Sequence, residues 1–181
     1  MKLDLREIPF YYINLKSQKD RMENMEKILS SLEIKEYHRV DAQSHSNGFA
    51  GCAQTVANFL KSRKGPFVLL EDDISLKNWN PIIEIPDDAD SFYLGISGWG
   101  RMNGHSGPCV QHEKISDNII RIRNMLSGHA VLYLTQEWID MVQRVCYFAG
   151  YQIESYYDVQ VAEVMRFYNV YAFDDPYFYQ T

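Results

Sequence analysis

Three consecutive carboxylates, Glu71, Asp72 and Asp73, follow directly on an apolar run at residues 67–70. Adjacent carboxylates repel one another, so the cluster costs stability unless a positive group lies near it. A divalent cation such as Mg²⁺ or Mn²⁺ is a natural partner, because hard cations prefer oxygen ligands and also bind phosphate oxygens. Alternate residues at a strand end point to opposite sides, so Glu71 and Asp73 should differ in direction from Asp72. The triplet is therefore a candidate metal site.

The triplet by itself leaves other interpretations open. Strands often end in aspartate, so the three acids could form a solvated turn. A phosphatase-like or nuclease-like metal site could use the same acids, as could a nucleotide-sugar site. Two-metal hydrolases, however, need a second dense group of acids or histidines, which the sequence does not offer in one region.

The composition narrows the class of ligand. Of the 181 residues, 46% are hydrophobic and 23% are charged, which is typical of a globular chain. The net charge of −6 gives no general positive field that would attract nucleic acid or an anionic membrane. We therefore expect no nucleic-acid partner, and a phosphate-bearing ligand would have to be bound locally by a metal, a few arginines or backbone amides.

The cysteines and the apolar runs indicate the compartment. Cys52, Cys109 and Cys146 are odd in number and widely spaced, without a CxxC or Cys/His cluster, so we expect reduced thiols and no structural zinc site. The opening stretch MKLDLREIPF lacks the apolar core of a signal peptide. No apolar run approaches the roughly 20 residues that span a bilayer. These features predict a cytoplasmic protein without a transmembrane segment.

The hydrophobic pattern predicts the elements that position the triplet. In the first half we expect a strand at 9–15, a helix behind Ser17, a strand at 37–42, a helix at 49–63 and a strand at 67–70. Ser17 opens the sequence S-Q-K-D, which resembles a capping box. The last strand is apolar at every position, as expected of a central strand covered on both faces.

The second half is predicted to contain more strands than helices. Expected there are a strand at 91–96, a glycine-rich loop at 97–108, a hairpin of 109–115 with 118–124, a strand at 129–134, helices at 136–149 and 157–168, and a short strand with an aromatic tail from 169. No repeat or linker interrupts the chain, so we expect a single domain over 1–181. The alternation in the first half predicts an α/β fold with a mostly parallel central sheet and flanking helices. In such sheets ligands bind beyond the carboxyl ends of the strands, which is where the triplet lies.

Several motifs, in order, resemble glycosyltransferase family 25, which includes lipopolysaccharide and collagen galactosyltransferases. They are YINLK with Asp20-Arg21, RVDA at 39–42, Gly51-Cys52, LLEDDI at 69–74, HAVLYLT at 129–135, Asp158, and VYAFDDPYFYQ at 170–180. The chain departs from the family pattern at 53–56, where it reads AQTV and family members commonly carry Ser-His, and it is short for the family. The resemblance spans nearly the whole chain and implies a Rossmann-type domain of the GT-A class, a UDP-sugar donor and an inverting transfer.

The resemblance also implies roles for residues at the strand ends. Sugar transfer requires stabilisation of a leaving diphosphate, and a Mn²⁺ or Mg²⁺ ion held by Asp73, with Glu71 or Asp72 assisting, would supply it. The expected donor-binding residues are Asn14, Leu15, Arg21, Asp41, Glu71 and Asp72. Some GT-A enzymes complete the metal site with a late histidine, which makes His129 a candidate ligand, although a lone histidine is more often a hydrogen-bonding core residue.

Inversion requires a general base that takes the proton of the acceptor hydroxyl. Asp158 is the candidate, because it lies at a predicted helix start behind two tyrosines; the alternative is a helix-capping aspartate. We therefore expect a metal-dependent glycosyltransferase that moves a sugar from a UDP-sugar to a glycan or other hydroxyl acceptor. The alternatives are a non-catalytic nucleotide-sugar or carbohydrate-binding relative and a Mg²⁺-dependent phosphoester hydrolase.

Overall fold

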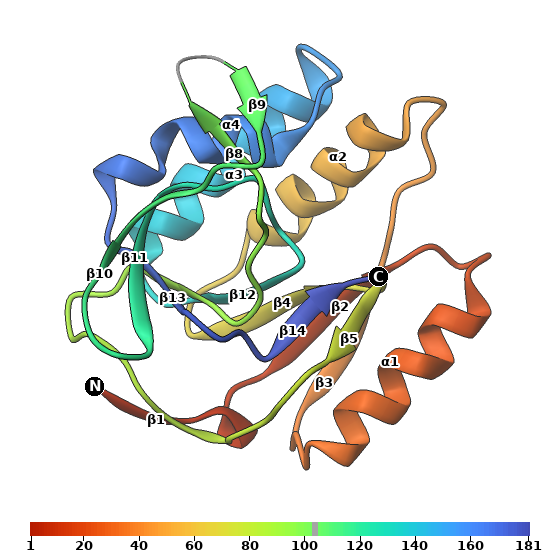
Figure 1. Cartoon of the computed structure of the whole chain (residues 1–181). Coiled ribbons are helices and arrows are strands. Elements are labelled where there is room, and N and C mark those ends of the chain that lie inside the picture. The colour runs from red at the N-terminus through yellow and green to blue at the C-terminus, as the bar shows by residue number, and fades with distance from the viewer. Residues whose placement is uncertain (103–104) are drawn as a thin grey trace.

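The computed structural model describes residues 1–102 and 105–181 and is built around an eight-stranded mixed sheet (Figure 1). The strand order is β10-β11-β13-β7-β12-β4-β2-β3. In that order the strands are Gln111–Lys114, Ile119–Asn124, Val170–Phe173, Ser91–Tyr93, Ala130–Tyr133, Phe67–Glu71, Phe10–Asn14 and Tyr37–Asp41.

The predicted parallel arrangement holds for only part of the sheet. β2 is parallel to both β3 and β4, and β13 is parallel to β7, whereas all the other neighbouring pairs of the sheet are antiparallel. The expectation of a mostly parallel sheet is therefore wrong. The physical reason lies in the connections: helices join β2, β3 and β4, but a hairpin joins β10 to β11, and a hairpin can only produce antiparallel neighbours.

Within the described residues, four α-helices and several short elements complete the fold. The helices are α1 Lys19–Ser31, α2 Gly48–Leu60, α3 Gln136–Tyr151 and α4 Tyr157–Val164, with 3-10 turns at Leu5–Glu7 and Met165–Phe167. Three short antiparallel pairs are β1 Lys2–Asp4 with β6 Ile82–Glu84, β5 Ile74–Leu76 with β14 Phe178–Gln180, and β8 Gly100–Met102 with β9 His105–Gly107.

Two local expectations need correction. The N-cap of α1 is Gln18, which makes no side-chain capping bond, so the capping box predicted at Ser17 does not form. The stretch 97–108, expected to be a loop, contains β8 and β9; residues 103 and 104 of that stretch lie outside the described residues.

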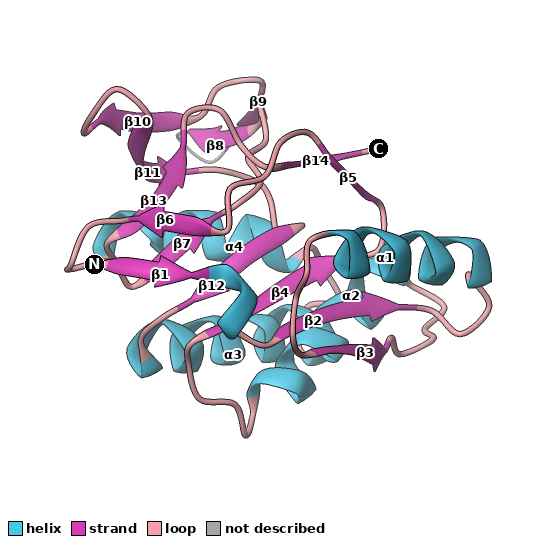
Figure 2. Ribbon diagram, turned by 90° about the horizontal axis from the view of Figure 1, so that it is seen from below, coloured by secondary structure: helices cyan, strands magenta, loops and turns pink. Residues whose placement is uncertain are grey.

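The inner strands of the sheet are buried on both faces, which explains why the sequence of β4 is apolar from Phe67 to Leu70. Phe67 and Leu69 belong to a cluster that includes residues of α2, α3 and α4, whereas Val68 and Leu70 pack with residues of α1, β5, β6 and β14. Accordingly, α1 lies on one side of the sheet and α2, α3 and α4 lie on the other (Figures 1 and 2). Side chains alternate along a strand, so Glu71 lies on the same face of β4 as Phe67 and Leu69, the face covered by α2, α3 and α4. The burial of β4 thus sets the direction of the first acid.

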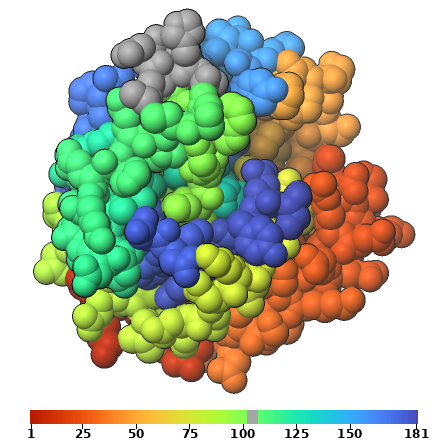
Figure 3. Space-filling model, in the orientation of Figure 1, coloured from red at the N-terminus to blue at the C-terminus, as the bar shows by residue number. Residues whose placement is uncertain are grey.

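The C-terminal segment returns to the triplet. β14 pairs with β5 in the register Gln180↔Ile74, so the last residues lie directly beside the strand that follows the acids. Figure 3 shows this segment in dark blue on the front face, against the yellow-green segment that contains β5, with the surface hollowed above it. Among the described residues, no helix combines the length and the apolar character needed to cross a membrane.

Candidate active site

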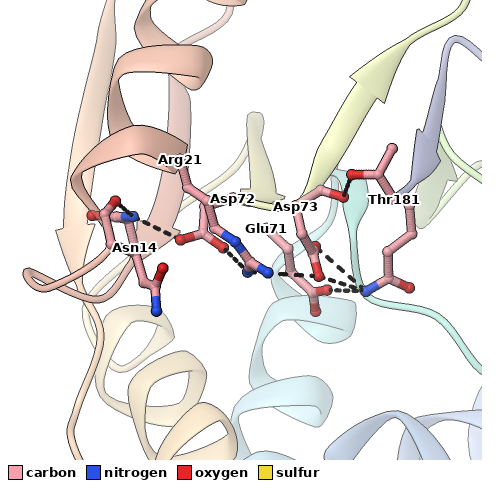
Figure 4. A network of polar contacts seen from close by, with 8 residues as sticks. Asn14, Arg21, Glu71, Asp72, Asp73 and Thr181 are labelled. Carbon is pink, nitrogen blue, oxygen red and sulfur yellow. Dashed lines mark hydrogen bonds and ion pairs between the residues drawn. The ribbon is translucent and has the colours of Figure 1, made fainter.

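The three acids leave β4 in different directions and find different partners (Figure 4). Glu71 accepts a hydrogen bond at Oε1 from the hydroxyl of Tyr157 (3.0 Å) and one at Oε2 from Nε2 of Gln180 (3.1 Å). The same Gln180 nitrogen lies 3.4 and 3.3 Å from the two carboxylate oxygens of Asp73. Asp72 instead faces the end of β2 and the first turn of α1. The acids therefore divide as the alternation predicts, with Glu71 and Asp73 sharing a partner that Asp72 lacks.

Asp72 is held by a network that joins four elements. Its Oδ2 accepts from Nδ2 of Asn14 (2.7 Å), and its Oδ1 accepts from the guanidinium of Arg21 (3.1 Å). Asn14 is only 1% exposed, and it also donates to the carbonyl of Gln18 (3.0 Å) and accepts from Arg39 (3.2 Å). An amide side chain offers two donors and an acceptor, and here all three are used. The network fixes the ends of β2 and β4 relative to α1 and β3.

Gln180 was not identified from the sequence, yet it organises the other two acids. Three carboxylate oxygens of Glu71 and Asp73 converge on its amide nitrogen, and Thr181 adds two hydrogen bonds, from its backbone N–H (2.8 Å) and its hydroxyl (3.0 Å), to the carbonyl of Asp73. Oxygens that converge on one positively polarised hydrogen-bond donor also suit a cation. Across residues 1–102 and 105–181, however, no group of three or more His, Cys, Asp or Glu side chains is arranged to hold a metal ion. At the point that the Gln180 amide occupies, the described part of the chain therefore supplies two carboxylates, those of Glu71 and Asp73.

The environment of the acids shifts their proton affinity. Burial, and secondly the charge of Asp73, raises the pKa of Glu71 to about 7, although the hydrogen bond from Tyr157 acts in the opposite direction. Burial also raises the pKa of Asp158. Both shifts follow from the cost of placing a charge where water is excluded. A carboxylate that is poorly solvated is a stronger proton acceptor than one in water.

Two cavities meet at Glu71. The first, which we name the β2 cavity, has a volume of about 320 Å³ and lies at the carboxyl ends of β2 and β4. The second, the α4 cavity, has a volume of about 250 Å³ and lies between the starts of α2 and α4. Glu71 and Cys52 line both cavities. The raised pKa of the Cys52 thiol, about 12 through burial, keeps that thiol protonated in the wall.

The structure brings most of the predicted site residues together. The β2 cavity is lined by Asn14, Leu15, Arg21, Glu71, Asp72 and Asp73, together with residues of the β3–α2 loop. Asp158 lines the α4 cavity in the first turn of α4, where its Oδ1 accepts from the N–H of Val159 (2.8 Å). It is not the N-cap of that helix, a position taken by Tyr156.

Two predicted residues lie elsewhere. Asp41 ends β3, but its side chain is 75% exposed, pairs with Arg39 and does not line the β2 cavity. His129, expected as a metal ligand, has a ring that is buried: Nδ1 lies 2.7 Å from the hydroxyl of Ser127, and Nε2 packs so closely on Gly95 that a Cβ there would come within 2.2 Å. Burial lowers the pKa of His129 to about 4, so the ring is neutral. His129 therefore lies in the core directly before β12 and lines neither cavity, so the structure does not bring it to the predicted metal site.

Gly128 and Tyr157 are two further residues of the site that were not among the predicted site residues. A Cβ on Gly128 would lie 1.8 Å from the Tyr157 hydroxyl, so only glycine leaves room for the bond between Tyr157 and Glu71. The sequence offers one signal for this close approach, the glycine directly before the strand of His129.

Comparison with known proteins adds little to this geometry. No family model matches the chain, and no curated protein matches it. One solved structure with a similar arrangement is the nucleoside-diphosphate-sugar pyrophosphorylase from Vibrio cholerae RC9, with a TM-score of 0.49 and 12% sequence identity over 93% of this chain and 73% of that chain. At this TM-score the likeness assigns neither fold nor function.

Proposed function

We propose that the chain is an inverting glycosyltransferase that moves a sugar from a UDP-sugar donor to a hydroxyl group of an acceptor. The observation that carries the proposal is the assembly of the β2 cavity. Six residues expected to bind the donor or its metal, drawn from the ends of β2 and β4 and the first turn of α1, line this one cavity. Such a crevice beyond the carboxyl ends of parallel strands is the usual ligand site of an α/β sheet.

The β2 cavity offers each part of the donor a different surface. The nucleoside would lie against Leu15, which is partly exposed beyond the end of β2. Arg21 is 49% exposed and already lies between Asp72 (3.1 Å) and Asp73 (3.9 Å), so its remaining N–H groups can reach a diphosphate. Asp73 and Glu71 would hold a Mn²⁺ or Mg²⁺ ion, which when bound supplies positive charge to the leaving diphosphate.

The α4 cavity is the site that we propose for the acceptor. An acceptor hydroxyl in the α4 cavity would approach the sugar carbon across the wall formed by Glu71. The acceptor oxygen forms a bond to the anomeric carbon, the bond from that carbon to the phosphate oxygen breaks, and the electron pair leaves with UDP. Asp158 takes the proton of the hydroxyl, a role that suits a carboxylate whose pKa is raised by burial.

A thermal-shift series tests the donor. UDP-, GDP-, CDP- and dTDP-sugars are added to the protein with and without Mn²⁺, and the UDP-sugars should raise the melting temperature most in the presence of the metal, by mass action. Asp73→Asn should remove most of this shift. Asp175→Asn is the matched control, because Asp175 is an exposed aspartate paired with Lys77 and does not line the β2 cavity.

The proposal fails if no nucleotide sugar stabilises the protein with metal present, or if Asp73→Asn leaves the shift intact. A hydrolase is distinguished by its product. Mass spectrometry of the reaction with a UDP-sugar and a mixture of saccharide acceptors should show a sugar joined to an acceptor, whereas a phosphoester hydrolase would release free sugar phosphate or phosphate without a joined product.

A further inference from the structure

The α4 cavity carries a pair of aromatic rings at its rim. Phe49, in the first turn of α2, and Tyr156, directly before α4, have ring centroids 3.7 Å apart with planes inclined by 31°. Both side chains also line the cavity, and they are 48% and 47% exposed. Large aromatic side chains normally bury most of their surface. A pair that remains half exposed at the mouth of a cavity therefore offers a ready apolar surface to a ligand.

The pair is held in place from both sides. Asn47 caps α2, because its Oδ1 accepts from the N–H groups of Phe49 (3.1 Å) and Ala50 (3.5 Å). The amide nitrogen of the same Asn47 donates to the carbonyl of Glu154 (2.7 Å), in the segment between α3 and Tyr156. One side chain thus ties the start of α2 to the segment that presents Tyr156. The ring pair is a preorganised feature, which lowers the entropy lost when a ligand binds.

The charges in the α4 cavity narrow the chemistry of its ligand. Its lining residues, all within the described part of the chain, include the carboxyl groups of Glu71 and Asp158 but no lysine, arginine or histidine. A phosphorylated or carboxylated ligand would meet only like charge there. Hydroxyl groups, by contrast, can donate to carboxylate oxygens, and the C–H groups on one face of a sugar ring can pack on an aromatic surface.

The volume of the α4 cavity limits the size of the ligand that it can enclose. Its volume of about 250 Å³ is below the roughly 300 Å³ at the lower end for drug-sized ligands. We propose that the α4 cavity binds one neutral sugar ring, stacked on the Phe49–Tyr156 pair, and that the acceptor of the transferase is therefore a neutral saccharide. That the bound sugar is the acceptor rests on the proposed function. The binding of a neutral sugar ring by the α4 cavity can be tested without any donor.

Saturation-transfer NMR on the wild-type protein provides that test. The probes are methyl glycosides of glucose, galactose, mannose and N-acetylglucosamine, with glucuronic acid and glucose 6-phosphate as anionic counterparts. We expect at least one neutral glycoside to receive saturation, strongest on the ring protons of one face, and the anionic sugars to receive little. Tyr156→Ala and Phe49→Ala should each weaken binding at least tenfold, whereas Tyr156→Phe, which retains the ring, should preserve it.

Matched controls separate this inference from the proposed function. Tyr147→Ala removes a tyrosine of similar exposure (49%, against 47% for Tyr156) that does not line the α4 cavity, and it should leave saccharide binding unchanged. The UDP-sugar thermal shift should persist in Tyr156→Ala, because Tyr156 does not line the β2 cavity. The inference is overturned if no neutral glycoside binds, if the anionic sugars bind equally well, or if both alanine variants bind like the wild type. If UDP-sugars do not raise the melting temperature of the wild-type protein, the proposed function alone is overturned.

Discussion

The hydroxyl of Tyr157 donates a 3.0 Å hydrogen bond to Oε1 of Glu71 and so joins the first residue of α4 to the last residue of β4. Both residues line the α4 cavity, and Glu71 also lines the β2 cavity. The residue after Tyr157 is Asp158, so the same bond also fixes the start of the helix that presents the candidate base. The pKa of Tyr157 is raised by burial, which keeps its hydroxyl protonated as the donor.

Removal of this hydroxyl should destabilise the protein. In Tyr157→Phe the part-buried Oε1 of Glu71 loses its donor, and a hydrogen-bonding group left without a partner away from water costs about 1–3 kcal/mol. We expect a corresponding decrease in the free energy of unfolding in urea. The control is Tyr151→Phe, which loses a surface hydrogen bond from Asn58 and should change stability by about 0.5 kcal/mol or less. Equal effects of the two substitutions would show that the bond to Glu71 contributes nothing special.

Gly128→Ala should break the same bond from the other side. The added Cβ would lie 1.8 Å from the Tyr157 hydroxyl and 2.7 Å from the ring carbon that bears it, so the ring must move. Overpacking of this kind typically costs about 1–3 kcal/mol. Gly98→Ala is the control, because no atom lies within 4 Å of a Cβ at that position. The double variant Gly128→Ala/Tyr157→Phe should lose less free energy of unfolding than the sum of the two single losses, because both substitutions remove the same interaction. If the losses measured in urea are strictly additive, this prediction is wrong.

His129 should make the stability depend on pH between 4 and 6.5. Its pKa is lowered from 6.5 to about 4 by burial, so the unfolded chain binds a proton in this range that the folded chain rejects. The stabilising effect of the neutral ring is complete above pH 6.5 and is lost as the pH falls toward 4, by about 3 kcal/mol in total. His129→Asn should show a correspondingly smaller loss over that range. In the wild type, an NMR titration should find the His129 ring neutral at pH 5.5; a protonated ring there would refute the assignment.

The first half of the fold could be predicted from the sequence because its signals are local. The apolar run of β4, the helical spacing in α1 and the strand ends at Asn14 and Asp41 are each encoded within a few residues. In the second half the hairpin and both helices were also predicted, but the directions of the strands in the sheet were not. Its strands are short, and their direction in the sheet depends on which neighbour each one pairs with, as β12 pairs antiparallel with β4. Such pairing is decided by the packing of the whole chain and leaves little trace in the alternation of residues.

The sequence alone indicates that three acids follow a strand buried on both faces, and therefore that they point alternately to its two sides. The partners of the three acids, by contrast, follow from the folded chain. Gln180 and Tyr157, which bind Glu71, lie 109 and 86 residues away along the chain, and Arg21 reaches Asp72 across 51 residues. The tertiary structure also placed His129 in the core and opened a second cavity beside Asp158. The physical reason is that the direction of a side chain follows from the local backbone, whereas its partners follow from the path by which distant segments return to the same sheet edge.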